Sequence, residues 1–254
     1  MTVRQMDLKT KLKDVARKRG AVAFGVASVD DADALKPVKI TWGVNAYTKK
    51  LRNSMPTARS VIVFGIASQD DADELQITRS KGSFEWPGYT RLGLIARDIM
   101  RVLRECGFKA SFPSELASYK RIAQLAGVGS FGKHTLIINE KYGPWLRLEM
   151  VLTDAPLEPD KPFDENLCGR CDRCVRACPM RALKPYVIDP DRCLVAAAEM
   201  DRVPPSMKKA MERHSPLITP NARVMCTTCQ KACRYTSAER RRSSIARRVK
   251  GRNA

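Results

Sequence analysis

Four cysteines at a fixed, tight spacing constrain this chain more than any other feature of its sequence. Cys168, Cys171, Cys174 and Cys178 are followed by Pro179, which gives the pattern C-x2-C-x2-C-x3-C-P. This spacing is typical of bacterial ferredoxins, in which three thiolates hold one [4Fe-4S] cluster and the fourth holds another. Zinc sites instead tend to consist of two separated C-x2-C pairs. The run therefore predicts iron-sulfur binding, with zinc and a single cluster as less favoured alternatives.

Four more cysteines downstream complete a set of eight. Cys193 stands alone, and Cys226, Cys229 and Cys233 form a C-x2-C-x3-C run. In two-cluster ferredoxins the fourth cysteine of a run binds the other cluster. This rule predicts two [4Fe-4S] clusters with the following ligands: Cys168, Cys171, Cys174 and Cys233 for the first, and Cys178, Cys193, Cys226 and Cys229 for the second.

The uneven distribution of cysteine predicts how the chain is divided. Eight of the nine cysteines lie between 168 and 233. The segment just before them, residues 154–164, holds three prolines and no periodic apolar pattern. We therefore expect three parts: a cofactor and substrate domain over residues 1–158, a ferredoxin-like domain with two [4Fe-4S] clusters over 159–236, and a basic tail over 237–254.

The same features predict a cytoplasmic protein. Thiols are kept reduced in the cytosol, so clustered cysteines there indicate metal binding sooner than disulfides. The N-terminal segment lacks the apolar region of a secretory signal. No run of about 18 apolar residues predicts a membrane span.

The first 158 residues mix helical and strand patterns without a strict βαβ rhythm. We expect an α+β domain with a mixed sheet. Cys106, at the end of an apolar helical face, is predicted to be a buried, inert thiol. Apolar periodicity and flanking glycines predict helices over residues 7–18, 89–106 and 115–125, and strands over 21–29, 60–68, 135–139 and 145–153.

One short segment occurs twice. Residues 24–35 and 64–75 are identical at nine of twelve positions, and each contains the sequence Asp-Asp-Ala-Asp after an apolar run. The favoured interpretation is a strand that ends in a turn, with aspartate capping a short helix. The alternative interpretation is a cation site.

A glycine-rich turn runs from Gly127 to Thr135, with the sequence GVGSFGKHT. Its glycines allow a close approach of the backbone to a ligand, and Lys133 is suited to bind a phosphate. The turn matches neither the phosphate-binding loop nor the dinucleotide fingerprint, because a helix precedes it and a strand follows. The pattern alone leaves a structural turn and a cofactor-lining loop as equal alternatives.

The order of these motifs resembles a known superfamily. Residues 126–163, from the glycine turn through YGPWLRL and VLTD, run directly into the cysteine runs. Over about residues 85–235 the chain resembles the epoxyqueuosine reductases and the corrinoid-dependent reductive dehalogenases. The resemblance implies a nitroreductase-like domain that binds cobalamin, with two [4Fe-4S] clusters delivering electrons to cobalt. It also implies that the corrinoid is lined by Gly127, Gly129, Gly132, Lys133, His134 and Thr135.

The chain departs from this superfamily where a proton donor is expected. Epoxyqueuosine reductases carry a catalytic aspartate about a dozen residues before the glycine turn, where this chain has Phe112 to Ser114 and no carboxylate until Glu115. It also lacks the twin-arginine signal of respiratory dehalogenases and the C-terminal helical repeats common among epoxyqueuosine reductases. Its length therefore suits neither activity fully.

Three residues remain as candidate catalytic groups. Dehalogenases use a tyrosine with a basic partner, and Tyr119 next to Lys120 and Arg121 offers such a pair on a predicted helix. His134 beside the glycine turn is the third candidate, because histidine titrates near neutral pH. The predicted catalytic residues are therefore Tyr119, Lys120 and His134.

The strong positive charge has only a partial explanation in the clusters. The chain has 46 basic and 27 acidic residues, a net charge of +19. Each oxidised cluster with four thiolates carries about −2, so two clusters compensate a minority of this excess. Residues 234–254 contain eight basic residues and one acidic residue. This tail predicts either an arm that binds RNA or an anionic protein, or a solubilising segment without a partner.

Together these features predict an iron-sulfur oxidoreductase. We expect a low-potential donor such as ferredoxin or flavodoxin to pass electrons through the clusters to a cofactor, which the resemblance implies is a corrinoid. The expected substrate is a small molecule or a nucleoside. The alternatives are a tRNA epoxyqueuosine reductase, and a non-catalytic electron-transfer or activator protein.

Overall fold

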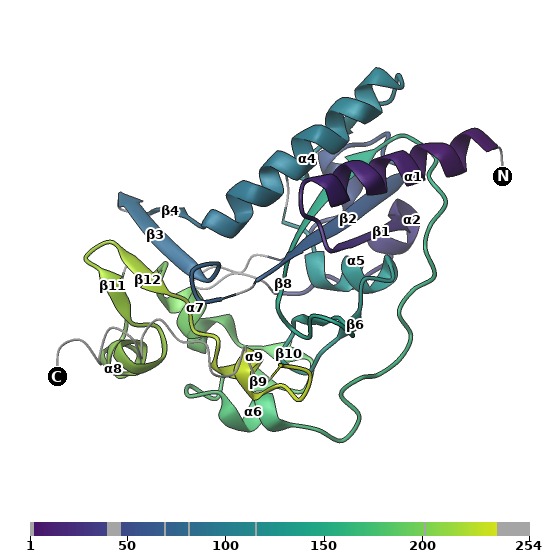
Figure 1. Cartoon of the computed structure of the whole chain (residues 1–254). Helices are drawn as coiled ribbons and strands as arrows, with labels where there is room; N and C mark the ends of the chain where they lie inside the picture. The colour runs from purple at the N-terminus through teal and green to yellow at the C-terminus, as the bar shows by residue number, and fades with distance from the viewer. Residues whose placement is uncertain are drawn as a thin grey trace.

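The structure is a computed structural model that describes residues 3–39, 47–68, 70–80, 82–114, 116–200 and 202–237 (Figure 1). Glu115 and nearly all of the predicted basic tail, from residue 238 onward, lie outside these ranges. Within them, no helix is both long enough and apolar enough to cross a bilayer.

A four-stranded sheet forms the centre of the N-terminal part. It contains β1 (Ala23–Ser28), β2 (Ser60–Ala67), β8 (Leu146–Thr153) and β5 (Ala110–Ser111), in the order β1-β2-β8-β5. Every pairing in it is antiparallel. The prediction of a mixed sheet is therefore wrong for the described strands, because each strand pairs with a neighbour of opposite direction and no βαβ crossover brings two parallel strands together.

Helices cover both faces of this sheet. Helices α1 (Val3–Lys18) and α4 (Pro87–Glu105) lie on one face, where Leu12 and Leu92 pack with Phe64 of β2. The other face is covered by α2 (Val29–Asp33), α3 (Leu51–Ser54) and α5 (Tyr119–Leu125). Because strand side chains alternate, β2 supplies apolar residues to both faces, and all eight of its residues are buried.

Most predicted elements are confirmed, although several are shorter than predicted; the strand predicted at 21–29, for example, is limited to β1. Helix α5 begins at Tyr119 instead of 115, since the carbonyl of Leu116 accepts a bond from the Lys49 N–H and not from a helical partner. The strand predicted at 135–139 is limited to β7 (Ile137–Ile138), because Thr135 has a left-handed φ of 63°. Cys106 is exposed, not buried, because it caps α4 beyond the apolar face.

A second sheet joins distant parts of the sequence. The hairpin β3 (Leu75–Ser80) and β4 (Ser83–Glu85) pairs with the hairpin β11 (Leu217–Thr219) and β12 (Ala222–Val224), in the order β11-β12-β3-β4. Strands from residues 1–158 and from 159–236 therefore form one sheet, so hydrogen bonds link the two predicted domains.

The cysteine-rich part consists of short elements. Helices α6 (Arg173–Ala177) and α9 (Thr228–Ala232) lie side by side in Figure 1. The others are the hairpin β9 (Leu183–Lys184) and β10 (Val187–Ile188), a 3-10 turn (Pro190–Arg192), α7 (Leu194–Ala197) and α8 (Pro205–His214). The short strand β6 (Ser130–Phe131), in the glycine turn, pairs with β7.

The repeated acidic segment folds differently in its two copies. In the first, Ser28 caps α2 by accepting a bond from the Asp30 N–H, and Asp33 accepts one from the Leu51 N–H at 2.5 Å. In the second, Asp71 lies 3.4 Å from the Lys231 ammonium, and Asp73 pairs with Arg91. These carboxylates bind the protein's own groups, which agrees with the turn interpretation, although in the first copy serine supplies the cap instead of aspartate.

Candidate functional site

The two cysteine runs have equivalent local structures. Cys174 and Cys229 are the second residues of α6 and α9, which are both five residues long. Cys178 and Cys233 occupy the C-cap positions of these helices, each with a φ of −64°. Because α6 and α9 are neighbours, the last cysteine of each run is brought close to the thiols of the other run.

The eight thiols form two groups. Cys174 and Cys233 interact electrostatically with each other and with Cys168, and Cys233 also interacts with Cys171. We call these four the first thiol group. The second thiol group contains Cys226 and Cys229, which interact with Cys178 and Cys193. This grouping follows the sets predicted from the spacing. That each group binds a cluster stays a prediction.

Backbone amides are directed at the sulfur atoms. The N–H of Lys133 donates to Cys168 Sγ at 3.3 Å, and the N–H of Ala182 donates to Cys178 Sγ at the same distance. Such bonds stabilise a thiolate relative to a thiol and tune the potential of a cluster. In the described residues no three His, Cys, Asp or Glu side chains converge closely enough to hold a single metal ion. A [4Fe-4S] cluster is larger than an ion, so its four thiolates lie farther apart.

The glycines of the turn are explained by packing within the chain. A Cβ atom on Gly129 would lie 2.4 Å from the carbonyl oxygen of Ile138, and one on Gly132 would lie 2.6 Å from the His134 ring. Gly127 has a φ of 70° and faces the carbonyl of Lys161. The structural interpretation therefore accounts for all three glycines, and corrinoid contact stays a prediction.

Lys133 connects this turn to the first thiol group. Besides its N–H bond to Cys168, its ammonium donates to the carbonyl of Gly169 at 2.8 Å. Cys168 itself is held from a second direction, because Asn166 Oδ1 accepts the N–H of Cys168 at 3.1 Å. Lys133 thus supports the cysteine loop. The sequence suggested a phosphate as its partner and did not predict this contact.

His134 is buried next to this loop. Its Nδ1 accepts the N–H of Leu136 at 3.1 Å, so the proton of the neutral ring is on Nε2. Burial lowers the pKa of His134 to about 4. At neutral pH the ring is therefore uncharged, which does not suit the predicted role of proton donor.

Tyr119 faces a carboxylate and not the predicted basic partner. Its phenol interacts with Glu149 on β8. Burial, and next the charge of Glu149, raises the pKa of Tyr119, so the phenol keeps its proton at neutral pH. Lys120 is exposed, and the Arg121 guanidinium lies 5.4 Å from the Phe131 ring centre. Successive helical residues point about 100° apart, which separates these side chains from Tyr119.

Four functional candidates around Tyr119 were missed in the sequence. Arg147 forms an ion pair with Glu74 and lies 5.4 Å from the Tyr89 ring centre. Burial raises the pKa of the Glu149 carboxyl. We call Tyr119, Glu149, Tyr89, Arg147 and Glu74 the tyrosine site. The signal available in the sequence was the pair of charges at alternate positions of an otherwise apolar strand, LRLEMVLT.

The tyrosine site adjoins the second thiol group. The N–H of Met225, next to Cys226, donates to the carbonyl of Glu74 at 2.9 Å. On the following helix, Gln230 Nε2 donates to the carbonyl of Pro144 at 2.9 Å. These bonds join the segment of Cys226 and Cys229 to the residues that carry Glu74 and Arg147.

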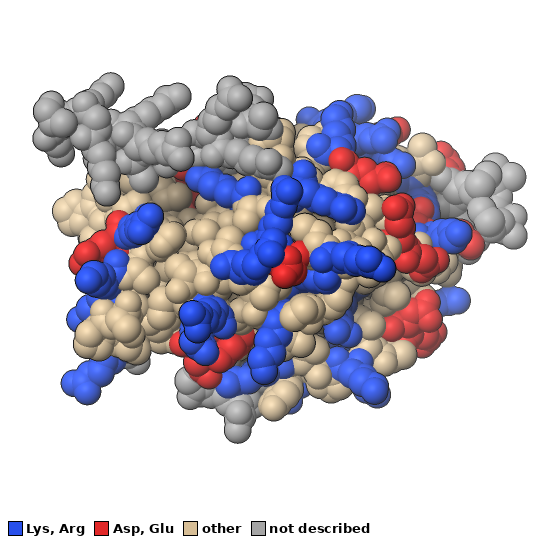
Figure 2. Space-filling view, turned by 90° about the horizontal axis from the view of Figure 1, so that it is seen from below, with Lys and Arg blue, Asp and Glu red and all other residues tan. Residues whose placement is uncertain are grey.

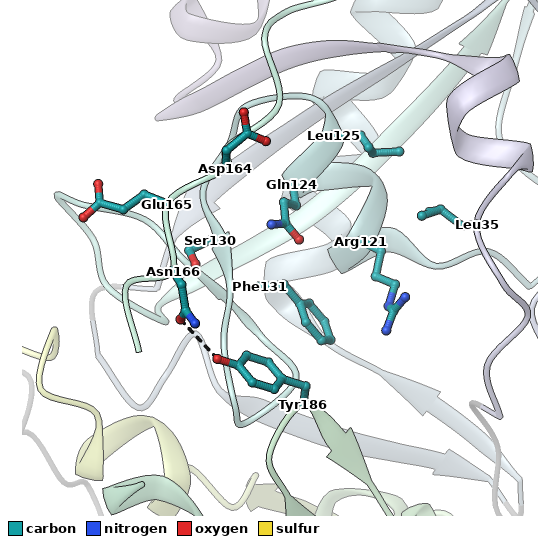
Figure 3. Close-up of a pocket in the computed structure, with 10 residues that line it drawn as sticks. All are labelled: Leu35, Arg121, Gln124, Leu125, Ser130, Phe131, Asp164, Glu165, Asn166 and Tyr186. Carbon is teal, nitrogen blue, oxygen red and sulfur yellow. Dashed lines mark hydrogen bonds between the residues drawn. The ribbon is translucent and has the colours of Figure 1, made fainter. Parts of the chain in front are cut away.

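A cavity lies near the first thiol group (Figure 3). Its volume is about 360 Å³, and Arg121 and Phe131 line one side of it. Tyr186 lies beside Phe131, and its hydroxyl donates to Asn166 Oδ1 at 3.1 Å, which is the bond drawn in Figure 3. The predicted catalytic tyrosine, Tyr119, is not among its lining residues.

Comparison with known sequences supports the motif analysis. Residues 161–184 match the family described as a 4Fe-4S binding domain. Over 156 residues the chain is 30% identical to the epoxyqueuosine reductase of Leadbetterella byssophila, a match that covers 61% of this chain and 49% of that protein. The chain covers 32% to 49% of the length of three curated epoxyqueuosine reductases, about a third to a half.

Comparison with solved structures supports the fold. A crystal structure of epoxyqueuosine reductase with an epoxyqueuosine-modified tRNA stem loop matches 92% of this chain and 67% of that chain, with a TM-score of 0.69 and 20% identity. A catabolic reductive dehalogenase matches 94% of this chain and 32% of that chain, with a TM-score of 0.57 and 17% identity. The predicted resemblance is thus confirmed, with a mixed helix and sheet fold. The nitroreductase-like detail stays a prediction.

Proposed function

We propose that this protein is an iron-sulfur reductase that acts on an epoxide-bearing nucleoside in RNA. The observation that carries the proposal is the tyrosine site, where a protonated phenol lies beside Glu149 and where the backbone of Glu74 is hydrogen-bonded to Met225, the neighbour of Cys226. Reducing an epoxide to an alkene takes two electrons and two protons, and the oxygen leaves as water. The proposed site needs an electron supply and a group that delivers the first proton to the opening oxygen, while solvent supplies the second. We place both the electrons of the second cluster and the proton of Tyr119 at the tyrosine site.

The eight cysteines are the proposed cluster ligands. Cys168, Cys171, Cys174 and Cys233 would hold the first cluster, and Cys178, Cys193, Cys226 and Cys229 the second. When bound, two such clusters supply electrons one at a time. The residues fit this role because backbone N–H groups already donate to Cys168 and Cys178, as expected for anionic sulfur ligands.

Tyr119 is the proposed proton donor. Its raised pKa keeps the proton on the phenol until a stronger base forms, and the oxygen of an opening epoxide is such a base. Glu149 orients the hydroxyl, and Arg147 with Glu74 holds the opposite side of the site. Tyr119 thus takes the role of the aspartate that epoxyqueuosine reductases carry before the glycine turn.

The substrate class is inferred from the relatives. Curated relatives are epoxyqueuosine reductases, and a matching structure contains a tRNA stem loop. This favours the tRNA alternative over reductive dehalogenation, since the dehalogenase structure matches with a TM-score of 0.57 and 32% of that chain, against 0.69 and 67% for the epoxyqueuosine reductase structure. A corrinoid is suggested by the dehalogenase similarity alone. The glycines expected to line it pack against the chain itself, so we derive no step through it.

The test is reduction of a modified RNA. Protein reconstituted with iron and sulfide is incubated without oxygen with dithionite and an epoxyqueuosine-containing tRNA stem loop, and nucleosides are measured by mass spectrometry. Loss of a general acid typically lowers the rate by about 10²–10⁴-fold, so Tyr119→Phe should do the same. Tyr142→Phe, which removes a hydroxyl elsewhere, should be near wild type. Unchanged epoxyqueuosine with the wild-type protein would refute the proposal.

A further inference from the structure

We propose that an acidic electron-transfer protein docks on an arginine face beside the first thiol group. This inference rests on the proposed function, because it assigns the electron donor of the same clusters. The arginine face consists of Arg170, Arg173, Arg176 and Arg234, all of which are exposed. Figure 2, the view from below, shows Lys and Arg side chains across the centre of this side of the molecule, with acidic side chains mainly toward its edges.

The two thiol groups have different surroundings. In the first group, Cys168 and Cys171 flank the exposed residues Gly169 and Arg170. In the second group, Cys226 packs against the apolar cluster of Leu194 and Met211. Three of the four thiols of the first group are buried, and those of the second group are half-buried. A partner can still approach the first group over the exposed loop that separates Cys168 from Cys171.

The second thiol group instead faces the tyrosine site. Met225 donates to the Glu74 carbonyl, and the Lys231 ammonium lies 3.4 Å from buried Asp71. The groups also adjoin each other, because Cys229 interacts with Cys174. The geometry assigns a direction in which electrons enter at the first group and leave from the second.

The arginine face lies directly over the entry point. Arg234 interacts electrostatically with Cys168 and Cys171, and it donates to the carbonyl of Leu167 at 2.5 Å. Arg173 and Arg176 lie three residues apart on α6, which carries Cys174. Asp172, which lies between Arg170 and Arg173 in the sequence, pairs with Arg176 at 3.2 Å. An acidic surface placed here would bring a donor's cofactor close to the first cluster.

A protein donor fits this face better than the RNA substrate does. RNA must present its modified base to the tyrosine site, which adjoins the second thiol group. The arginine face surrounds the first group instead, and an RNA bound there would not place its modified base at Tyr119. Complementary charge accelerates association by roughly 10–10³-fold at low salt, which suits a brief electron-transfer encounter.

The experiment measures reduction of the reconstituted full-length protein by reduced flavodoxin in a stopped-flow instrument, at 50 and 300 mM salt. Arg170→Glu with Arg173→Glu should lower the second-order rate at low salt about tenfold or more and weaken its salt dependence. Lys208→Glu with Lys209→Glu on α8 makes the same change of charge elsewhere and should stay within about twofold of wild type. Calorimetric binding of oxidised flavodoxin should weaken in the first variant only.

Controls separate this inference from the proposed function. Iron content and photoreduction by deazaflavin should be equal in all variants; if charge reversal lowers iron content, Arg173→Gln and Arg176→Gln replace it. Equal flavodoxin rates in both double variants would overturn the inference. A loss of stem-loop binding with an unchanged flavodoxin rate would also overturn it, since the face would then bind RNA. Failure of dithionite-driven RNA reduction would instead refute the proposed function and leave the docking result intact.

Discussion

Replacing Thr236 with valine should destabilise the protein by about 2–3 kcal/mol. The Thr236 hydroxyl accepts the indole N–H of Trp145 at 3.1 Å and donates to the carbonyl of Gln230 at 2.6 Å. Trp145 is 3% exposed and Thr236 is 4% exposed, so water cannot replace the hydroxyl. Valine keeps the shape and removes both bonds. Each lost hydrogen bond costs about 1 kcal/mol, and a buried donor deprived of its acceptor costs about 1–3 kcal/mol.

This change acts on the connection between the central sheet and Cys233, the last of the predicted cluster ligands. Trp145 immediately precedes β8, and Thr236 lies three residues after Cys233. In a protein of this size, 1 kcal/mol shifts the melting temperature by about 2–4 °C, so we expect a decrease of roughly 5–10 °C. Loss of the cluster absorbance during anaerobic heating measures this shift.

Thr219→Val is the matched control. Thr219 is exposed and bonds Asn221 in a surface hairpin, so its replacement should change stability by less than about 0.5 kcal/mol. A melting temperature of Thr236→Val within about 2 °C of wild type would refute the argument that this buried bond pair connects the two parts.

Two further predictions concern burial and close packing. Burial lowers the pKa of His134 from 6.5 to about 4. Between about pH 4 and pH 6.5 the unfolded chain therefore binds a proton at His134 that the folded chain does not bind. Stability should therefore fall as pH drops from about 6.5 toward 4, by on the order of 3 kcal/mol, and denaturant titration of His134→Gln should show a flatter profile. Gly129→Ala should cost about 1–3 kcal/mol, because its Cβ would lie 2.4 Å from the Ile138 carbonyl. On α4, Gly93→Ala has open space and should stabilise by about 0.5–1 kcal/mol; equal effects of the two substitutions would contradict the packing argument.

The sequence was most informative where a local pattern determines the structure. Apolar periodicity located α1 and α4, because each helix buries one apolar stripe against the sheet. Apolar runs located β1, β2 and β8, because these strands lie between the two apolar clusters. The cysteine spacing anticipated the two thiol groups, since the short helices that carry Cys174 and Cys229 have the same length and the same C-cap geometry.

Strand direction and the composition of the tyrosine site could not be predicted from local sequence patterns, because both depend on contacts between distant residues. Pairing across long connections depends on tertiary contacts, so the antiparallel sheet and the β3–β12 pairing left no local signal. Tyr119 was identified, but its partner was taken from the adjacent Lys120 and Arg121. The side chain that meets it is Glu149, thirty residues along the chain, because α5 packs against β8.

The most direct test of the account is the iron content of two double cysteine variants. Because Cys178 and Cys193 are assigned to the same cluster, Cys178→Ala with Cys193→Ala should remove one cluster and keep about half of the wild-type iron, with the electron paramagnetic resonance signal of one reduced [4Fe-4S] cluster. Cys178→Ala with Cys233→Ala should damage both clusters. If the first variant instead lost both clusters, or if the wild-type protein bound zinc in place of about eight iron atoms, the crossed two-cluster arrangement would be contradicted.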